Sequence, residues 1–435
     1  MSSQTVPDLI NLETSMLPAR VATPGSVQRR SSRRWSLPAV VTRDFTEPFD
    51  GWRILSEVPG NLGLALWQAV RDSELWASAT EREGLFRPGA TEWRRQLLEA
   101  ADVPAELTAA LDVLTELVTH PADVHPDLAT MACSRVARWA EASGSLATAL
   151  GFAQAAALAR PERGRLAVEV GRLAAECGDP ARGEAWLRRA VGLCRREMGA
   201  ASHGAAGAYA CAWVELGNLY GARNEQDRAR RAYVRAFRSA KRSGEREPRG
   251  RALWGLGRLD MRAGRHNEAE KVLRPALRLL RENVVARADV AHDLAEVWLR
   301  QGDAARAAPV LQRLLLERTT PGEQLRTLSL LCLAAAQCDD SSAASDAWHR
   351  AQALSAELPP SPSHALALQD LARGAAVAGE CRRSIDAARR AEEMGASEPD
   401  CCTGLPAQAL LIGASRPGES TSSSKWADPL RSTTP

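Results

Sequence analysis

The histidines and cysteines are the residues best able to do chemistry, and their spacing matches no catalytic or metal-binding motif. His292 and Glu296 lie four residues apart, so a helix would place both on one face, where they could be two ligands of a metal ion. A third ligand is missing, so we interpret the pair as a surface hydrogen bond. The sequence has no HExxH, phosphate loop, GxSxG elbow or dinucleotide fingerprint. We predict no enzyme activity, no catalytic residue, no metal site and no cofactor.

The nine cysteines are odd in number, scattered and without CxxC spacing. Five of them lie among alanine and leucine at helical spacing, where a reduced thiol packs as a small apolar group: Cys133, Cys177, Cys194, Cys211 and Cys332. The N-terminal residues lack the basic and apolar regions of a signal peptide, and the longest strongly apolar run, residues 328–336, is too short for a membrane span. We therefore predict a cytoplasmic protein with no membrane span.

Arginine supplies almost all of the positive charge, since only Lys241, Lys271 and Lys425 are lysines among 56 basic residues. Guanidinium groups suit bidentate capture of carboxylates or phosphates, although a GC-rich coding genome gives the same bias without a function behind it. The net charge of +3 argues against bulk binding of nucleic acid, although a local patch could still bind it.

One segment, residues 223–251, concentrates this charge, with eleven basic and four acidic residues. Within it, five arginines at alternating steps of three and four form one helical ridge: Arg228, Arg231, Arg235, Arg238 and Arg242. This arginine ridge is either a solvated outer face or a docking surface for an acidic protein, RNA or DNA. Exposed aromatic residues would favour nucleic acid, but we expect Tyr233 and Phe237 to be buried.

Both ends of the chain have the composition of disordered segments. Residues 1–45 are rich in serine, proline and arginine and form a basic arm, and residues 400–435 form a polar tail. The arm contains QRRSSRRWSLP at residues 28–38. The basic cluster before Ser36 could be a phosphorylation site, a membrane-surface anchor, a docking motif or plain disordered chain.

Between these ends the periodicity predicts helices and almost no strands. Residues 46–125 are cut by proline and glycine at several points, which favours a small module of three or four short helices. Residues 130–399 change to alanine, leucine and arginine at sustained helical spacing.

The clearest spacing lies in residues 213–237, which read WVELGNLYGARNEQDRARRAYVRAF. Trp213, Leu216 and Tyr220 share one face of a first helix, and Gly217 lacks a side chain, so that a second helix can approach. The facing stripe of the second helix alternates small and large residues: Ala229, Tyr233 and Ala236. The two stripes predict an antiparallel helical hairpin.

The same frame occurs in seven copies, each with a small residue at its centre: Ala137, Gly171, Gly217, Gly257, Ala295, Cys332 and Ala372. The pattern W-x2-L-G-x2-Y followed by A-x3-Y-x2-A resembles the tetratricopeptide repeat. Most steps between copies exceed the roughly 34 residues of that family, its closing proline is mostly missing, and Asp260 replaces an aromatic residue in the fourth copy. The resemblance implies an all-α, right-handed α-solenoid of helix-turn-helix repeats that follows the small helical N-terminal module.

Arrays that this chain resembles are protein-interaction scaffolds, in which the first helix of each repeat lines a concave groove. The resemblance implies groove-facing positions at residues that could bind a peptide with carboxylates: Arg138, Arg172, Asn218, Trp254 and Arg258. The alternative is a solvated inner face in an arginine-rich protein. A clamp for chaperone tails is not expected, because Gly255 stands at one of its positions and Asp289 and Asp293 would repel a carboxylate.

We therefore expect a scaffold or adaptor that binds a protein or peptide, which could be acidic; the partner's identity and the oligomeric state stay open. A second hypothesis is a regulator that contacts nucleic acid or an acidic partner through the arginine ridge or the N-terminal helices. A third is an enzyme whose site lies in residues 46–125.

Overall fold

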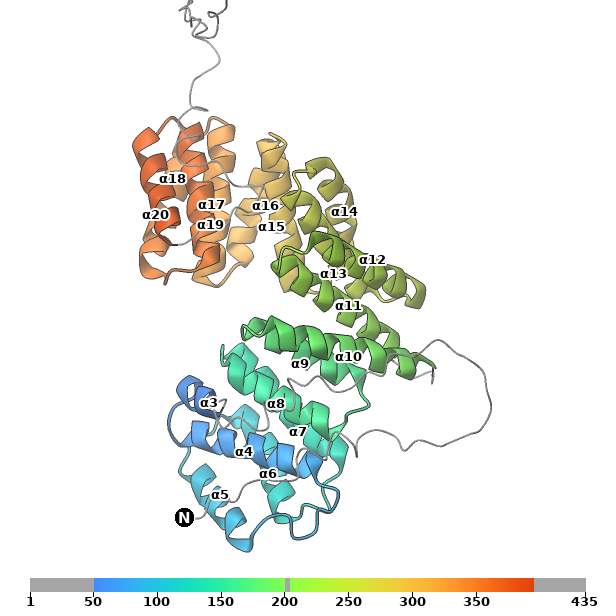
Figure 1. The fold of residues 1–435 in the computed structure, drawn as a ribbon. Coiled ribbons are helices and arrows are strands. Elements are labelled where there is room, and N and C mark those ends of the chain that lie inside the picture. The colour runs from blue at the N-terminus through green and yellow to red at the C-terminus, as the bar shows by residue number, and fades with distance from the viewer. Residues whose placement is uncertain (1–50, 200–203, 395–435) are drawn as a thin grey trace, which may run out of the picture. The chain divides into compact units, whose positions relative to one another are not determined.

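The computed structural model describes residues 51–199 and 204–394, and within these ranges every regular element is a helix (Figure 1). The helices are α3 Gly51–Glu57, α4 Gly60–Ser78, α5 Pro88–Glu99, α6 Ala105–Thr119, α7 Pro126–Ala142, α8 Leu146–Ala159, α9 Gly164–Glu176, α10 Pro180–Gly199, α11 Ala205–Ala222, α12 Gln226–Ser243, α13 Arg246–Arg262, α14 His266–Leu279, α15 Val284–Arg300, α16 Ala304–Glu317, α17 Pro321–Gln337, α18 Ser341–Glu357, α19 Pro362–Val377 and α20 Cys381–Glu393. The all-α prediction is confirmed. The predicted arm, its basic cluster and the polar tail lie outside the described residues.

From α7 onward the helices alternate as first and second helices of hairpins, such as α7 with α8, α9 with α10 and α11 with α12, which pack against each other. Each small residue at the centre of the predicted frame lies in a first helix, from Ala137 in α7 to Ala372 in α19. The helix-turn-helix repeat predicted from the sequence is therefore confirmed.

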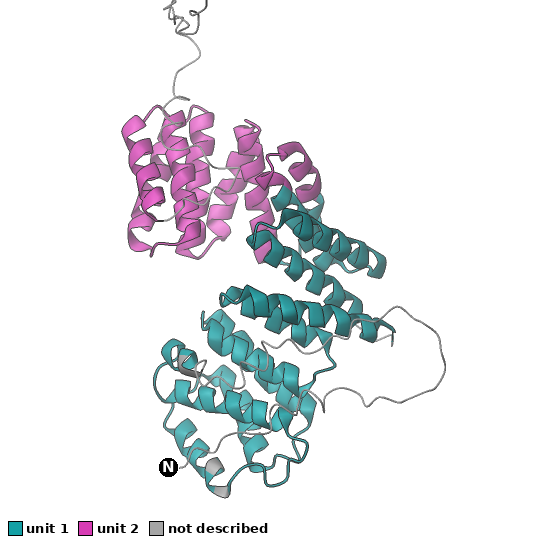
Figure 2. Cartoon of the chain, viewed as in Figure 1, with its two compact units in different colours: residues 1–259, 275–283 teal, residues 260–274, 284–435 magenta. Residues whose placement is uncertain are grey.

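The described chain divides into two compact units, which Figure 2 shows in different colours. The described residues of unit 1 are 51–199, 204–259 and 275–283, and those of unit 2 are 260–274 and 284–394. Within unit 1, α4 packs on α8 and α6 packs on α7, so the helices of the predicted module are joined to the first repeat. The predicted boundary near residue 125 stays a prediction.

The close approach of the two helices in the third hairpin depends on missing side chains. A Cβ atom added at Gly217 of α11 would lie 2.5 Å from the ring of Tyr233 of α12, and one added at Gly255 of α13 would lie 2.3 Å from it. Both distances are too short for any side chain, so Tyr233 fills the space that two glycines leave. Ala229 and Ala236, on the same stripe of α12, are fully buried, as the spacing predicted.

The turn inside every hairpin has one geometry. Seven residues after each small residue of the frame, one residue adopts the left-handed backbone conformation: Gly144, Gly178, Asn224, Gly264, Gly302, Asp339 and Gly379. The next N–H then donates to the carbonyl five residues before it, as Glu225 does to Tyr220 at 2.8 Å and Asp340 to Ala335 at 3.0 Å. This bond satisfies a free carbonyl at the helix end and fixes where the second helix starts.

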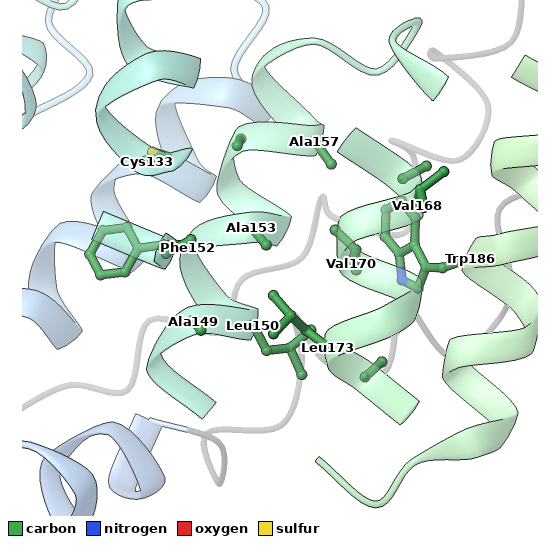
Figure 3. Packing of buried hydrophobic residues seen from close by; sticks show 14 of the residues in the cluster. Cys133, Ala149, Leu150, Phe152, Ala153, Ala157, Val168, Val170, Leu173 and Trp186 are labelled. Carbon is green, nitrogen blue, oxygen red and sulfur yellow. The ribbon is translucent and has the colours of Figure 1, made fainter. Parts of the chain in front are cut away.

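The core of unit 1 continues from the N-terminal helices into the repeats. Phe152 of α8 and Trp186 of α10 are buried, and Figure 3 shows Leu150 of α8 beside Leu173 of α9. The N-terminus of α8 is capped by Glu57, at the end of α3. Its carboxylate accepts hydrogen bonds from the backbone N–H groups of Ala147 and Thr148, both at 2.8 Å. Glu57 therefore ties α3 to the first hairpin.

Candidate interaction surface

The five residues predicted to face a groove all lie on first helices. Arg138 of α7, Asn218 of α11 and Arg258 of α13 are exposed, and Arg172 of α9 and Trp254 of α13 are half-buried. Arg258 places its guanidinium 5.9 Å from the ring of Trp254.

Arg172 is already engaged by carboxylates of its own chain. Its two terminal nitrogens donate to Glu141 of α7 at 2.7 and 2.9 Å, and one also donates to Glu176. Burial alone would lower the pKa of Arg172, but the hydrogen bonds with Glu141 and the nearby carboxylates raise it. An incoming carboxylate would have to displace these partners.

Asn218 is exposed, yet both ends of its amide have partners. Its Oδ1 accepts from the hydroxyl of Tyr233 at 2.8 Å, and its Nδ2 donates to Glu215 at 2.9 Å. Burial raises the pKa of Glu215, although the hydrogen bond from Asn218 and the charge of Arg251, 3.8 Å away, oppose that rise. Asn218 therefore belongs to a local network on α11 to α13.

A hollow of about 530 Å³ lies in unit 1 at the start of the array, and Arg138 is one of the residues that line it. It is bounded by α6, α7 and α9, and Ala153 and Ala156 of α8 lie at its base. Leu128 and Met131, one turn apart on α7, are 51% and 67% exposed there. Together the two side chains expose apolar surface on one wall of the hollow.

Four arginines also line this hollow: Arg135, Arg138, Arg163 and Arg165. Arg163 pairs with Asp127 at 2.7 Å, whereas the other three form no ion pair within the described residues. Arg135 and Arg138 each donate one hydrogen bond to a backbone carbonyl. Of these four, only Arg138 could be predicted from repeat spacing, because the contribution of α6 and the opening between α7 and α9 leave no periodic signal in the sequence.

The arginine ridge of α12 is not uniform. Arg231, Arg235, Arg238 and Arg242 are exposed, and Arg235 also lies 4.7 Å from the ring centre of Trp213. Arg228 lies 4.1 Å from the ring centre of Tyr220 and pairs with Glu184 of α10 at 2.9 Å and also with Glu225. Two of the five predicted ridge residues therefore stabilise the packing of hairpins through cation–π contacts.

The contact around Arg228 recurs in unit 2. Tyr220 donates its hydroxyl to Glu184 at 3.0 Å beneath Arg228. Trp298 likewise donates its indole N–H to Glu270 at 2.9 Å, and Arg306 lies over its ring and donates to the same carboxylate at 2.8 Å. In both cases the acid is the fifth residue of one second helix and the arginine is the third residue of the next.

The interpretation of His292 and Glu296 as a surface hydrogen bond is wrong. His292 is only 4% exposed, and neither of its ring nitrogens has a hydrogen-bond partner. Burial and the neighbouring Asp370 raise the pKa of Glu296, while Arg300 opposes the rise. His292 is buried and Glu296 is half-buried, a detail that i, i+4 spacing does not reveal. In the part of the chain that the structure describes, no group of three potential ligands suits a metal ion.

No protein-family model matches the sequence, and a search of curated proteins gives no match. Solved structures of helical repeat proteins are similar at low sequence identity. Aspartyl phosphate phosphatase F from Bacillus subtilis is 10% identical, with 82% of this chain and 96% of that chain covered and a TM-score of 0.49. BtubC from P. vanneervenii is 18% identical, with 55% and 96% covered and a TM-score of 0.41. A tetratricopeptide repeat protein from Parabacteroides merdae is 14% identical, with 66% and 98% covered and a TM-score of 0.40.

The chain is tetratricopeptide-like in its fold, as the hairpins and their shared turns show. None of the described helices is both long and apolar enough to cross a membrane.

Proposed function

We propose that this chain is an adaptor that binds a partner protein or peptide on the first helices of its repeats and catalyses no reaction itself. The observation that carries the proposal is the hollow between α6, α7 and α9, where exposed apolar side chains lie beside arginines without ion pairs. A partner that covers Leu128 and Met131 would remove apolar surface from water, which contributes roughly 25 cal/mol per Å². The cytoplasm as its place of action belongs to the same proposal.

Several residues of the repeat pattern serve helix packing. Gly217 and Tyr233 let α11 and α12 meet, and Tyr220 closes the contact with Glu184. With these assigned to packing, the surfaces left for function are the hollow, the exposed groove positions and the outer arginines.

The test is retention of partner proteins by the immobilised full-length chain, measured by quantitative mass spectrometry. Met131→Glu places a charge in the hollow and should lower the amount of partner protein retained at least tenfold. Leu316→Glu is the matched control, because Leu316 of α16 is 87% exposed and lies outside the hollow. Retention of the same proteins in the same amounts by Met131→Glu would refute the role of the hollow.

The arginine ridge favours a second candidate function, docking of an acidic partner or nucleic acid. Arg231, Arg238 and Arg242 are exposed and form no ion pair within the described residues. Phosphate binding of this kind weakens steeply with salt. We would measure binding of random-sequence DNA and RNA at several salt concentrations, with Arg231→Glu/Arg238→Glu as the variant. Binding that is absent, or that the variant retains, removes nucleic acid as the ligand of the arginine ridge.

A further inference from the structure

We propose that the hollow binds an amphipathic helix whose apolar stripe is flanked by acidic residues. This inference rests on the proposed function and names the partner's shape and charge. Three features of the structure carry it, namely the spacing of α7 and α9, the arrangement of apolar residues and the arginines without ion pairs.

The first feature is the spacing of the first helices. In unit 1, α9 packs against α11, and in unit 2, α17 packs against α19, but α7 and α9 do not pack against each other along their length. The space between them is the hollow, with α8 beneath it. A groove between two helices over a third is the geometry into which an additional helix packs.

The second feature is the arrangement of apolar groups. Leu128 and Met131 are neighbours on one face of α7, Leu166 lies on the opposite wall in α9, and Val113 of α6 lies beside them. Apolar residues of a bound helix recur at i, i+3 or i+4, and i+7, so they present one stripe to such a set of walls. The bound helix needs only one apolar stripe, because the arginines make the rim of the hollow polar.

The third feature is the charge of the rim. Arg135, Arg138 and Arg165 are exposed and without ion pairs in the described part of the chain, and the charge of Glu141 is engaged by Arg172. Only Glu169 among the lining residues adds a further negative charge. Asp or Glu beside the apolar stripe of the partner would complement this rim.

An extended peptide fits the hollow less well. Its backbone N–H and C=O groups need partners along their whole length, whereas a helix satisfies its own. No asparagine or glutamine lines the hollow, and the amide of Asn218 on α11 is already engaged. Backbone hydrogen bonding therefore favours a helix, and the charge of the rim favours an acidic one.

The experiment is a selection of displayed random 16-residue peptides on the full-length chain. The same library is passed over Met131→Glu/Arg138→Glu, and over Leu316→Glu/Arg278→Glu as a control in which one exposed apolar residue and one exposed arginine outside the hollow and the arginine ridge become glutamate. All four side chains are exposed, so the variants should keep the helical far-UV spectrum and the Tm of the wild type.

We expect peptides that are enriched on the wild type and the control but depleted at least tenfold on the hollow variant. Their sequences should show apolar residues at i, i+3 or i+4, and i+7, with Asp or Glu beside them. Synthetic copies should gain helical ellipticity on binding, and proline at the centre should weaken binding at least tenfold.

Each other outcome has a definite meaning. Depleted peptides that are basic, proline-rich or alternating in hydrophobicity, or that tolerate the central proline, overturn the helix proposal and leave the proposed function of the hollow standing. No peptide enriched on the wild type and depleted on the hollow variant overturns the helix proposal. The proposed function then depends on whether partner retention is lost in Met131→Glu.

Discussion

Several contacts between helices depend on one charged side chain, and Glu57 gives the clearest example. It caps two N–H groups in the first turn of α8 from the end of another helix, where an anion is favoured by the helix dipole. Glu57→Ala should lower the free energy of unfolding by about 1–3 kcal/mol. Chemical denaturation checks this, with the neighbouring exposed Ser56→Ala as a control that should change little. Equal stability of both variants would contradict the role of the cap.

Ionisation of Glu270 is predicted to make the stability of the fold depend on pH. The hydrogen bond from Trp298 lowers the pKa of Glu270 to about 2 from an ordinary 4.5, and Arg306 and Gln301 reinforce this against the effect of burial. A carboxylate with a lowered folded pKa stabilises the fold above its unfolded pKa, and this contribution is lost as pH falls from about 4.5 to about 2.

The measurement is Tm against pH between 6 and about 2.5. Glu270→Gln should lower the Tm near pH 6, and the difference from the wild type should shrink as the pH falls. Glu268→Gln is the control, because Glu268 is more exposed and pairs only with Lys271 at 2.7 Å. A difference that stays constant with pH would contradict the assignment.

At the scale of the element, the hairpin turn determines where the second helix begins. Asp339 has a φ of 59°, a conformation that costs a non-glycine residue energy, whereas Gly302 adopts it at the corresponding place without that cost. Asp339→Gly should raise the free energy of unfolding by about 0.5–1 kcal/mol, and Gly302→Ala should lower it by about 1 kcal/mol or more. Denaturant titration of both variants checks the signs, and a loss of stability in Asp339→Gly would be the contrary result.

The hairpins could be predicted from the sequence because their packing depends on side-chain size. The contact of Gly217 with Tyr233 is an example. The shared turn was also readable, since glycine, asparagine or aspartate stands seven residues after every small residue of the frame. The turn was not predicted, because the repeat was recognised from the spacing of apolar and small residues, which does not report backbone conformation.

The site was less predictable. Arg138 could be placed by the repeat, but the hollow arises because α7 and α9 separate, which depends on how whole helices pack. The partners of Arg172 and Asn218 come from other helices, so no spacing along the chain reveals that these side chains are engaged.

For the whole molecule, repeats that contact chiefly their neighbours should respond locally to damage. Gly217→Ala forces a methyl group against the ring of Tyr233 and should destabilise its surroundings by about 1–3 kcal/mol. Amide hydrogen exchange should rise in α11 and α12 of unit 1 and stay unchanged in α19 and α20 of unit 2. Equal acceleration in both units would show that the chain unfolds as one cooperative body.

The constant distance between the small residue and the left-handed turn bears on how such a chain can change in evolution. One residue inserted between Gly217 and Asn224 would rotate the turn by about 100° about the helix axis, and α12 would leave its place. The steps from one small residue to the next are unequal, so length has varied outside this interval. Length can therefore change in the second helices and in the loops between hairpins, whereas the seven residues from the small residue to the turn must be kept.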